Sequence, residues 1–80
     1  MRVIGDIPHP KFKITLFQWN GKYIMKFETG MCEQTYKFSE LDVFSEADVR
    51  NVVTNQKFIR QVEERFEAMH EDVYQYIAQL

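Results

Sequence analysis

Asn20 and Gly21 constrain the fold of this chain more than any other feature of the sequence. Both residues tolerate the positive φ that a two-residue type I′ hairpin turn requires, and they separate two runs in which apolar and polar residues alternate. The sequence therefore predicts two antiparallel strands, over 11–19 and 22–28. The turn also fixes the register, with the opposed pairs Trp19 and Lys22, Phe17 and Ile24, and Thr15 and Lys26.

This hairpin has one apolar and one basic face, because successive side chains of a strand point to opposite sides of a sheet. The face expected in the core carries Phe12, Ile14, Leu16, Tyr23, Met25 and Phe27. The other face carries an aromatic patch of Phe17, Trp19 and Ile24, flanked by Lys13, Lys22, Lys26 and Lys37.

The rest of the chain predicts one more strand and two helices. A strand over 31–38 follows a second tight turn at Thr29 and Gly30, which would place Lys26 opposite Glu33. Residues 1–10 are expected to be an extended lead-in, with at most a brief strand at 2–4, because Pro8 and Pro10 exclude a helix there.

A short helix over 46–54 is expected to begin with a capping box at Ser45 and Asp48. From 56 to 79, apolar residues recur at three- and four-residue steps, the pattern of a long amphipathic helix. The expected fold is α+β: a single small domain over 1–80, with a three-stranded antiparallel meander and both helices packed on one sheet face.

The long helix is expected to extend beyond the sheet. A helix of about 24 residues spans roughly 36 Å, whereas strands of eight or nine residues cover roughly 25–30 Å. The apolar stripe continues through Tyr76 and Leu80 into this extension, and a second copy of the chain is the simplest cover for it. The alternatives are that the N-terminal segment or the first helix fills the gap, or that the last turn of the helix frays.

Both outer strands of the meander, 11–19 and 31–38, have unpaired backbone groups along one side. Lys11, Lys13 and Lys37 fit protection against indiscriminate pairing. Selective pairing with an identical edge, or with the N-terminal residues, stays open.

Composition narrows the class of protein. Cys32 is the only cysteine, which excludes an intramolecular disulfide and a cysteine-rich zinc site and fits a reducing compartment. No leader-like apolar region opens the sequence, and no stretch approaches the roughly 20 apolar residues that cross a bilayer. We therefore expect a soluble cytoplasmic protein without membrane contact. Residues 11–38 balance to +3 and residues 39–80 to −5, so the strand half is basic and the helical half acidic.

The sequence offers no catalytic, cofactor or metal motif, and we expect a protein that is not an enzyme. Cys32 falls on the core face, and His9 and His70 have no metal-ligand spacing around them. The three glycines are isolated, so no phosphate-binding loop is present. A small-ligand site between sheet and helix, with Cys32, Tyr36 or His70 at its rim, has no positive motif.

We expect an interaction or structural module that self-associates as a homodimer, and another protein is a further possible partner. The candidate interaction surface comprises Phe17, Trp19, Lys22, Ile24, Lys26, Tyr76 and Leu80. The alternative is a module that binds single-stranded nucleic acid, with bases stacked on Trp19 and Phe17 and phosphates held by the lysines. A third interpretation is that these residues only stabilise a small sheet.

Overall fold

A computed structural model describes all residues, 1–80, with principal dimensions of 45 × 26 × 19 Å. The strands are β1 (Arg2–Ile7), β2 (Lys13–Trp19), β3 (Lys22–Thr29) and β4 (Cys32–Ser39). A 3₁₀ turn, η1 (Glu40–Asp42), leads to the helices α1 (Glu46–Val53) and α2 (Gln56–Asp72), and a π-helical turn, η2 (Val73–Ile77), extends α2. The α+β class and the two helices agree with the prediction from sequence.

The first predicted hairpin is confirmed in register. Trp19 lies opposite Lys22, Phe17 opposite Ile24 and Thr15 opposite Lys26. Asn20 has a φ of 56° and Gly21 a φ of 74°, as a type I′ turn requires.

The sheet has four strands in the order β1-β2-β3-β4, and the prediction of three was wrong. The N-terminal residues form a full edge strand that pairs antiparallel with β2, from Arg2 opposite Gln18 to Ile7 opposite Ile14. A bulge between Val3 and Gly5 interrupts the alternation of faces. Because a bulge shifts the two-residue period, this strand lacks the pattern that identifies its neighbours.

The second hairpin has a different loop from the predicted one. Thr29 pairs with Cys32, so the loop is Gly30-Met31, and Lys26 lies opposite Thr35 while Glu33 lies opposite Glu28. Gly30 has a φ of 50°, and a type II′ turn places such a glycine at its first central position. The pairing differs from the prediction by two residues, which leaves every side chain on its predicted face. Lys26 still contacts Glu33 diagonally, with Nζ 3.6 Å from Oε2.

Each helix begins at its predicted residue, but the capping box predicted for α1 does not form. Ser45 precedes α1 without a side-chain cap, and the carboxylate of Asp48 instead accepts a hydrogen bond from the amide of Phe44, at 2.8 Å. Asn55 caps α2 by accepting from the amide of Phe58, at 3.1 Å. The α-helix ends at Asp72, and the remaining turn is a π-helix.

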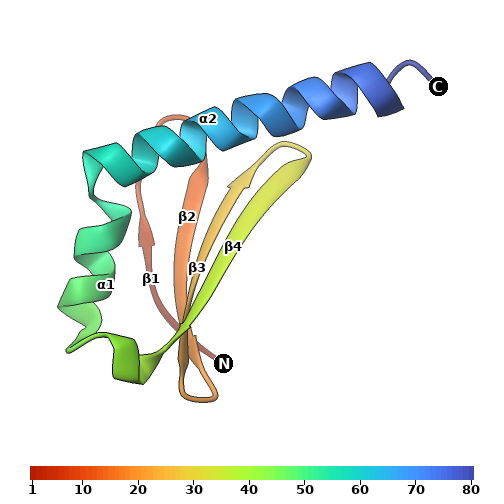
Figure 1. Cartoon of the computed structure of the whole chain (residues 1–80). Helices are drawn as coiled ribbons and strands as arrows, with labels where there is room; N and C mark the ends of the chain where they lie inside the picture. The colour runs from red at the N-terminus through yellow and green to blue at the C-terminus, as the bar shows by residue number, and fades with distance from the viewer.

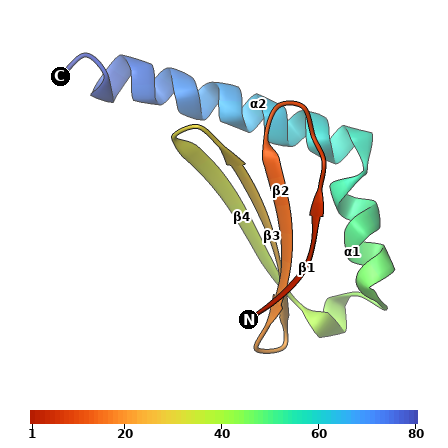
Figure 2. The ribbon, with the colours of Figure 1, turned by 180° about the vertical axis from the view of Figure 1, so that it is seen from behind.

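Both helices pack on one face of the sheet. Ile14, Leu16 and Phe27 of the sheet and Val49, Val53 and Val62 of the helices are almost completely buried. α1 runs beside β1, and α2 crosses the end of the sheet and continues past β4 (Figure 1). Seen from behind, the opposite face of the sheet is open (Figure 2). We call the face that the helices cover the inner face and the opposite one the outer face.

Candidate functional site

The outer face of the sheet has a shallow hollow of about 230 Å³. Its walls come from the start of the chain and three strands: Met1, Phe17, Trp19, Ile24, Lys26, Glu33, Thr35 and Lys37. The structure thus brings together the candidate residues Phe17, Trp19, Ile24 and Lys26, and Lys22 lies beside them opposite Trp19. Met1 was absent from the prediction, because its position depends on β1 pairing with β2.

Exposure within the hollow is uneven. Ile24 is only 6% exposed although no helix covers this face, so it forms the floor of the hollow. Trp19 is 51% exposed and Met1 73%. An aromatic ring and a flexible thioether beside a buried aliphatic floor form an apolar patch that another molecule can contact.

The charges around the hollow are partly neutralised within the chain. Lys26 lies between two carboxylates, with Nζ 3.6 Å from Glu33 and 4.0 Å from Glu28. Lys22 and Lys37 form no ion pair in the chain. Two free cations therefore flank the hollow, one on β3 and one on β4.

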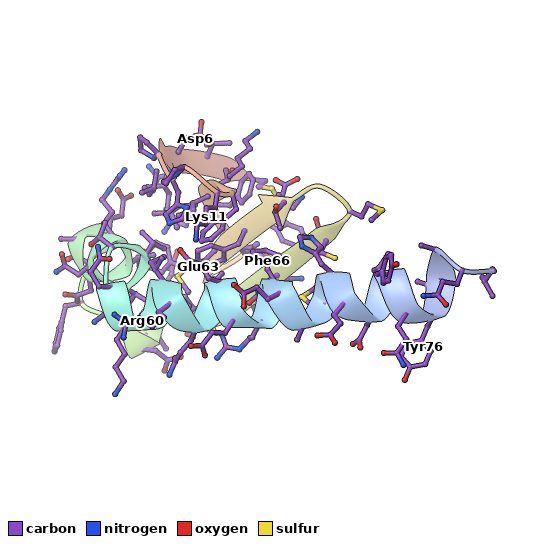
Figure 3. The ribbon with its side chains drawn as sticks, turned by 90° about the horizontal axis from the view of Figure 1, so that it is seen from above. Asp6, Lys11, Arg60, Glu63, Phe66 and Tyr76 are labelled. Carbon is purple, nitrogen blue, oxygen red and sulfur yellow. The ribbon has the colours of Figure 1, made fainter.

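The two remaining candidates, Tyr76 and Leu80, lie on a separate surface. α2 crosses the sheet at the end opposite the Asn20-Gly21 turn and then extends past it (Figure 1). Phe66 and Glu63 lie beside the strands, whereas Tyr76 lies on the free part of the helix (Figure 3). The structure therefore does not bring the helix candidates to the aromatic hollow.

The apolar stripe of α2 changes from buried to exposed along the helix. Val62 and Phe66 are at most 4% exposed, whereas Ile77 is 59% and Leu80 100% exposed. We call the residues from Val73 to Leu80 the overhang. Exposed Leu41 and Phe44, which connect β4 to α1, are further large apolar side chains that the sequence reasoning missed. These two residues belong to no strand-like or helix-like repeat of apolar residues, so the sequence did not indicate where they would lie.

The histidines stack on phenylalanine rings. The ring of His9 lies 4.0 Å from that of Phe12, and its Nε2 lies 3.6 Å from Glu63. His70 stacks on Phe66 at 6.2 Å and lines a hollow of about 140 Å³ beside Lys11 and Glu67. Cys32 and Tyr36 are not part of that hollow, so the three rim residues considered for a small-ligand site do not converge.

Metal-ligating side chains do not gather in this structure. No group of three or more histidine, cysteine, aspartate or glutamate residues could hold a metal ion. Cys32 is a free, buried thiol that packs within the apolar core.

A chain of hydrogen bonds joins β4 to α2. Gln34 donates to the carbonyl of Val62 at 2.9 Å and accepts from the hydroxyl of Tyr36 at 2.6 Å. Arg65 donates to the same hydroxyl at 2.8 Å. These contacts hold the helix across β4 and so fix the direction in which the overhang leaves the sheet.

Comparisons with protein-family models, curated proteins and solved structures give no match to this chain. None of its helices combines the length and the apolar character needed to span a bilayer.

Proposed function

We propose that this chain is a non-enzymatic interaction module that self-associates as a homodimer. The observation that carries the proposal is the run of apolar side chains along α2, which is buried at Phe66 and exposed at Ile77 and Leu80. Exposed apolar side chains that continue a buried stripe are typical of a surface that another molecule covers. A second copy of the chain carries the same apolar surface, so two copies can cover each other without a different partner protein.

The surroundings of the reactive side chains support a role other than catalysis. Cys32 is 9% exposed and packs against core side chains. Both histidines stack on phenylalanines, and neither is paired with a hydroxyl or thiol that it could activate.

A charge placed on the overhang stripe tests the proposal. Ile77→Asp puts a carboxylate where the dimer would bury an apolar side chain, so we expect monomers at concentrations where the parent chain is dimeric. Gln75→Asp is the matched control, since it adds the same charge to the same turn away from the stripe and should leave the dimer intact. Light scattering after size-exclusion chromatography measures both. Equal masses for Ile77→Asp and the parent would contradict a role of the overhang in self-association.

Trp19→Ala asks whether the outer hollow takes part in the same contact. If self-association used only the outer face, this variant would become monomeric while Ile77→Asp would remain dimeric. If both Trp19→Ala and Leu80→Ala leave the mass of the assembly unchanged, the candidate interaction surface is wrong.

A second candidate function is the binding of single-stranded nucleic acid on the outer face. The specific observation is the exposed ring of Trp19 beside the unpaired cations Lys22 and Lys37. A base could stack on the indole while the ammonium groups contact phosphates. Glu28 and Glu33 on the same face oppose this function, since they neutralise Lys26.

Fluorescence of Trp19 separates the two functions, because this residue is the only tryptophan. Titration with a short oligothymidine at low salt quenches the indole if bases stack on it, and added salt should reverse the quenching. Unchanged fluorescence at low salt excludes binding at this hollow.

A further inference from the structure

β4 is an edge strand of the sheet, and the backbone hydrogen-bonding groups along its free edge are not paired with another strand. It pairs only with β3, while α1 lies at the opposite edge of the sheet, beside β1 (Figures 1 and 2). Thr29 and Cys32 flank a two-residue loop and therefore form a hydrogen-bonded pair. The alternation along an antiparallel ladder then directs the amides and carbonyls of Glu33, Thr35 and Lys37 away from the sheet.

The side chains along this edge are complementary to a second copy of the same edge. With Thr35 on a twofold axis perpendicular to the sheet, residues 32–38 of two chains pair antiparallel. Glu33 of each copy then lies opposite Lys37 of the other. Lys37 has no ion pair within its own chain, and Glu33 shares Lys26 with Glu28. Two opposite-charge pairs therefore form across the symmetric contact.

Neighbouring symmetric registers lack this complementarity. An axis at Glu33 or at Lys37 places like charges directly opposite each other, which is destabilising. An axis at Gln34 or at Tyr36 pairs Thr35 with a charged residue and forms no ion pair. Among the symmetric registers centred on residues 33–37, only the one centred on Thr35 matches opposite charges.

The same register places an apolar surface of the second copy on the side toward which the overhang extends. It places Cys32 beside Phe38 of the second copy. The end of the sheet that α2 crosses therefore lies beside the end of the neighbouring sheet that carries the Asn20-Gly21 turn. α2 lies on the inner face, where Tyr23 and Phe38 form an aromatic pair with ring centroids 6.0 Å apart. Leu41, in the 3₁₀ turn that follows Phe38 in the sequence, is 94% exposed.

The overhang continues past β4, on the side where the second copy lies (Figure 1). Only Val73–Ile77 of the overhang are helical, as one π-helical turn, and the last three residues are not. The overhang therefore extends toward the β4 strand of the second copy. Figure 3 shows the side chain of Tyr76 on the side of the helix away from the strands, so this residue stays outside the contact.

We propose that two copies of this chain join their β4 edges antiparallel about Thr35, forming one eight-stranded sheet in which each overhang extends past the edge toward the other copy. This inference rests on the proposed self-association and specifies its surface. Backbone hydrogen bonds and the Glu33–Lys37 pairs set the register.

Charge reversal at the edge tests the register. Glu33→Lys and Lys37→Glu each place like charges opposite each other twice in the dimer, so each should raise the dimer dissociation constant roughly tenfold. The double variant Glu33→Lys/Lys37→Glu restores both opposite-charge pairs and should return the constant to within about threefold of the parent value. Sedimentation over a range of concentrations measures all three.

The single charge reversals should leave the fold of each chain intact, because the residues opposite them in the same chain do not repel the new charge. Glu33→Lys faces Glu28 within the chain, and Lys37→Glu faces the apolar Ile24. Lys57→Glu is the matched control for Lys37→Glu, because it makes the same change in charge at an exposed position of α2. It should leave the dissociation constant unchanged.

Cysteine cross-linking gives an independent measurement. Residues opposed in a hydrogen-bonded antiparallel pair have Cα atoms about 5.5 Å apart, which suits a disulfide. In a Cys32→Ala background, Thr35→Cys should form a covalent dimer under mild oxidation, and Asn51→Cys on α1 should not.

The outcomes separate this inference from the proposed function. A parent chain that dimerises, with unchanged constants for both single reversals or no covalent dimer of Thr35→Cys, refutes the edge pairing and leaves self-association standing. A parent chain that is monomeric at every concentration refutes both.

Discussion

Gln34 should contribute measurably to stability although it is a polar residue in an apolar core. It is 9% exposed, donates to the carbonyl of Val62 and accepts from the hydroxyl of Tyr36. Gln34→Leu removes both hydrogen bonds. The carbonyl of Val62 keeps its bond within the helix, and Tyr36 is half-buried, so water can reach it only in part. With about 1 kcal/mol for each neutral bond, offset by burial of the leucine side chain, we expect a loss of about 1–2 kcal/mol in the free energy of unfolding.

Tyr36→Phe is the matched variant for this measurement. It removes the hydroxyl and leaves the amide oxygen of Gln34 buried without its donor, so we again expect a loss of about 1–2 kcal/mol. Because the two residues share one bond, the double variant should lose less than the sum of the single losses. Urea unfolding followed by circular dichroism measures all four proteins at one concentration, since the stability of a dimer depends on concentration. A Gln34→Leu protein within about 0.3 kcal/mol of the parent, or strictly additive losses, would refute this explanation of the helix position.

Three further substitutions, two of them with a control variant, test the fold. Asn20→Ala should lose about 1 kcal/mol of unfolding free energy, because alanine is strained at the φ of 56° that this turn requires; an unchanged midpoint in urea would contradict the type I′ turn. Leu16→Ala removes a fully buried side chain and should lose about 2–5 kcal/mol, whereas the exposed Val3→Ala should stay within about 0.5 kcal/mol in the same assay. Asn55→Ala should lose about 1 kcal/mol through its helix cap, and Ser45→Ala should lose clearly less, because its side chain makes no cap hydrogen bond; equal losses in thermal unfolding would contradict this difference.

Local turn chemistry determined how well each part of the sheet could be predicted. Asn20 and Gly21 both adopt positive φ, which left one register for the first hairpin. In the second hairpin, Gly30 alone has positive φ, and it fits either position of a two-residue loop. The prediction placed it second, whereas the structure places it first. The faces were still predicted correctly, because a change of two residues preserves the alternation.

Other features depend on tertiary contacts that the sequence pattern does not contain. β1 was missed as a full strand because of its bulge and because Gly5 and Asp6 are poor strand formers. Ile24 is buried on a face that no helix covers, which depends on the large side chains of neighbouring strands. The extension of α2 past the sheet follows from lengths alone and was predicted, but its π-helical turn was not.

The mass of the parent chain in solution tests self-association most directly. Light scattering after size-exclusion chromatography, over a wide range of concentration, should show twice the 9.7 kDa of one chain at the higher concentrations. A mass of 9.7 kDa at every concentration would contradict self-association and would leave the overhang and the hollow beside Trp19 open to a different partner.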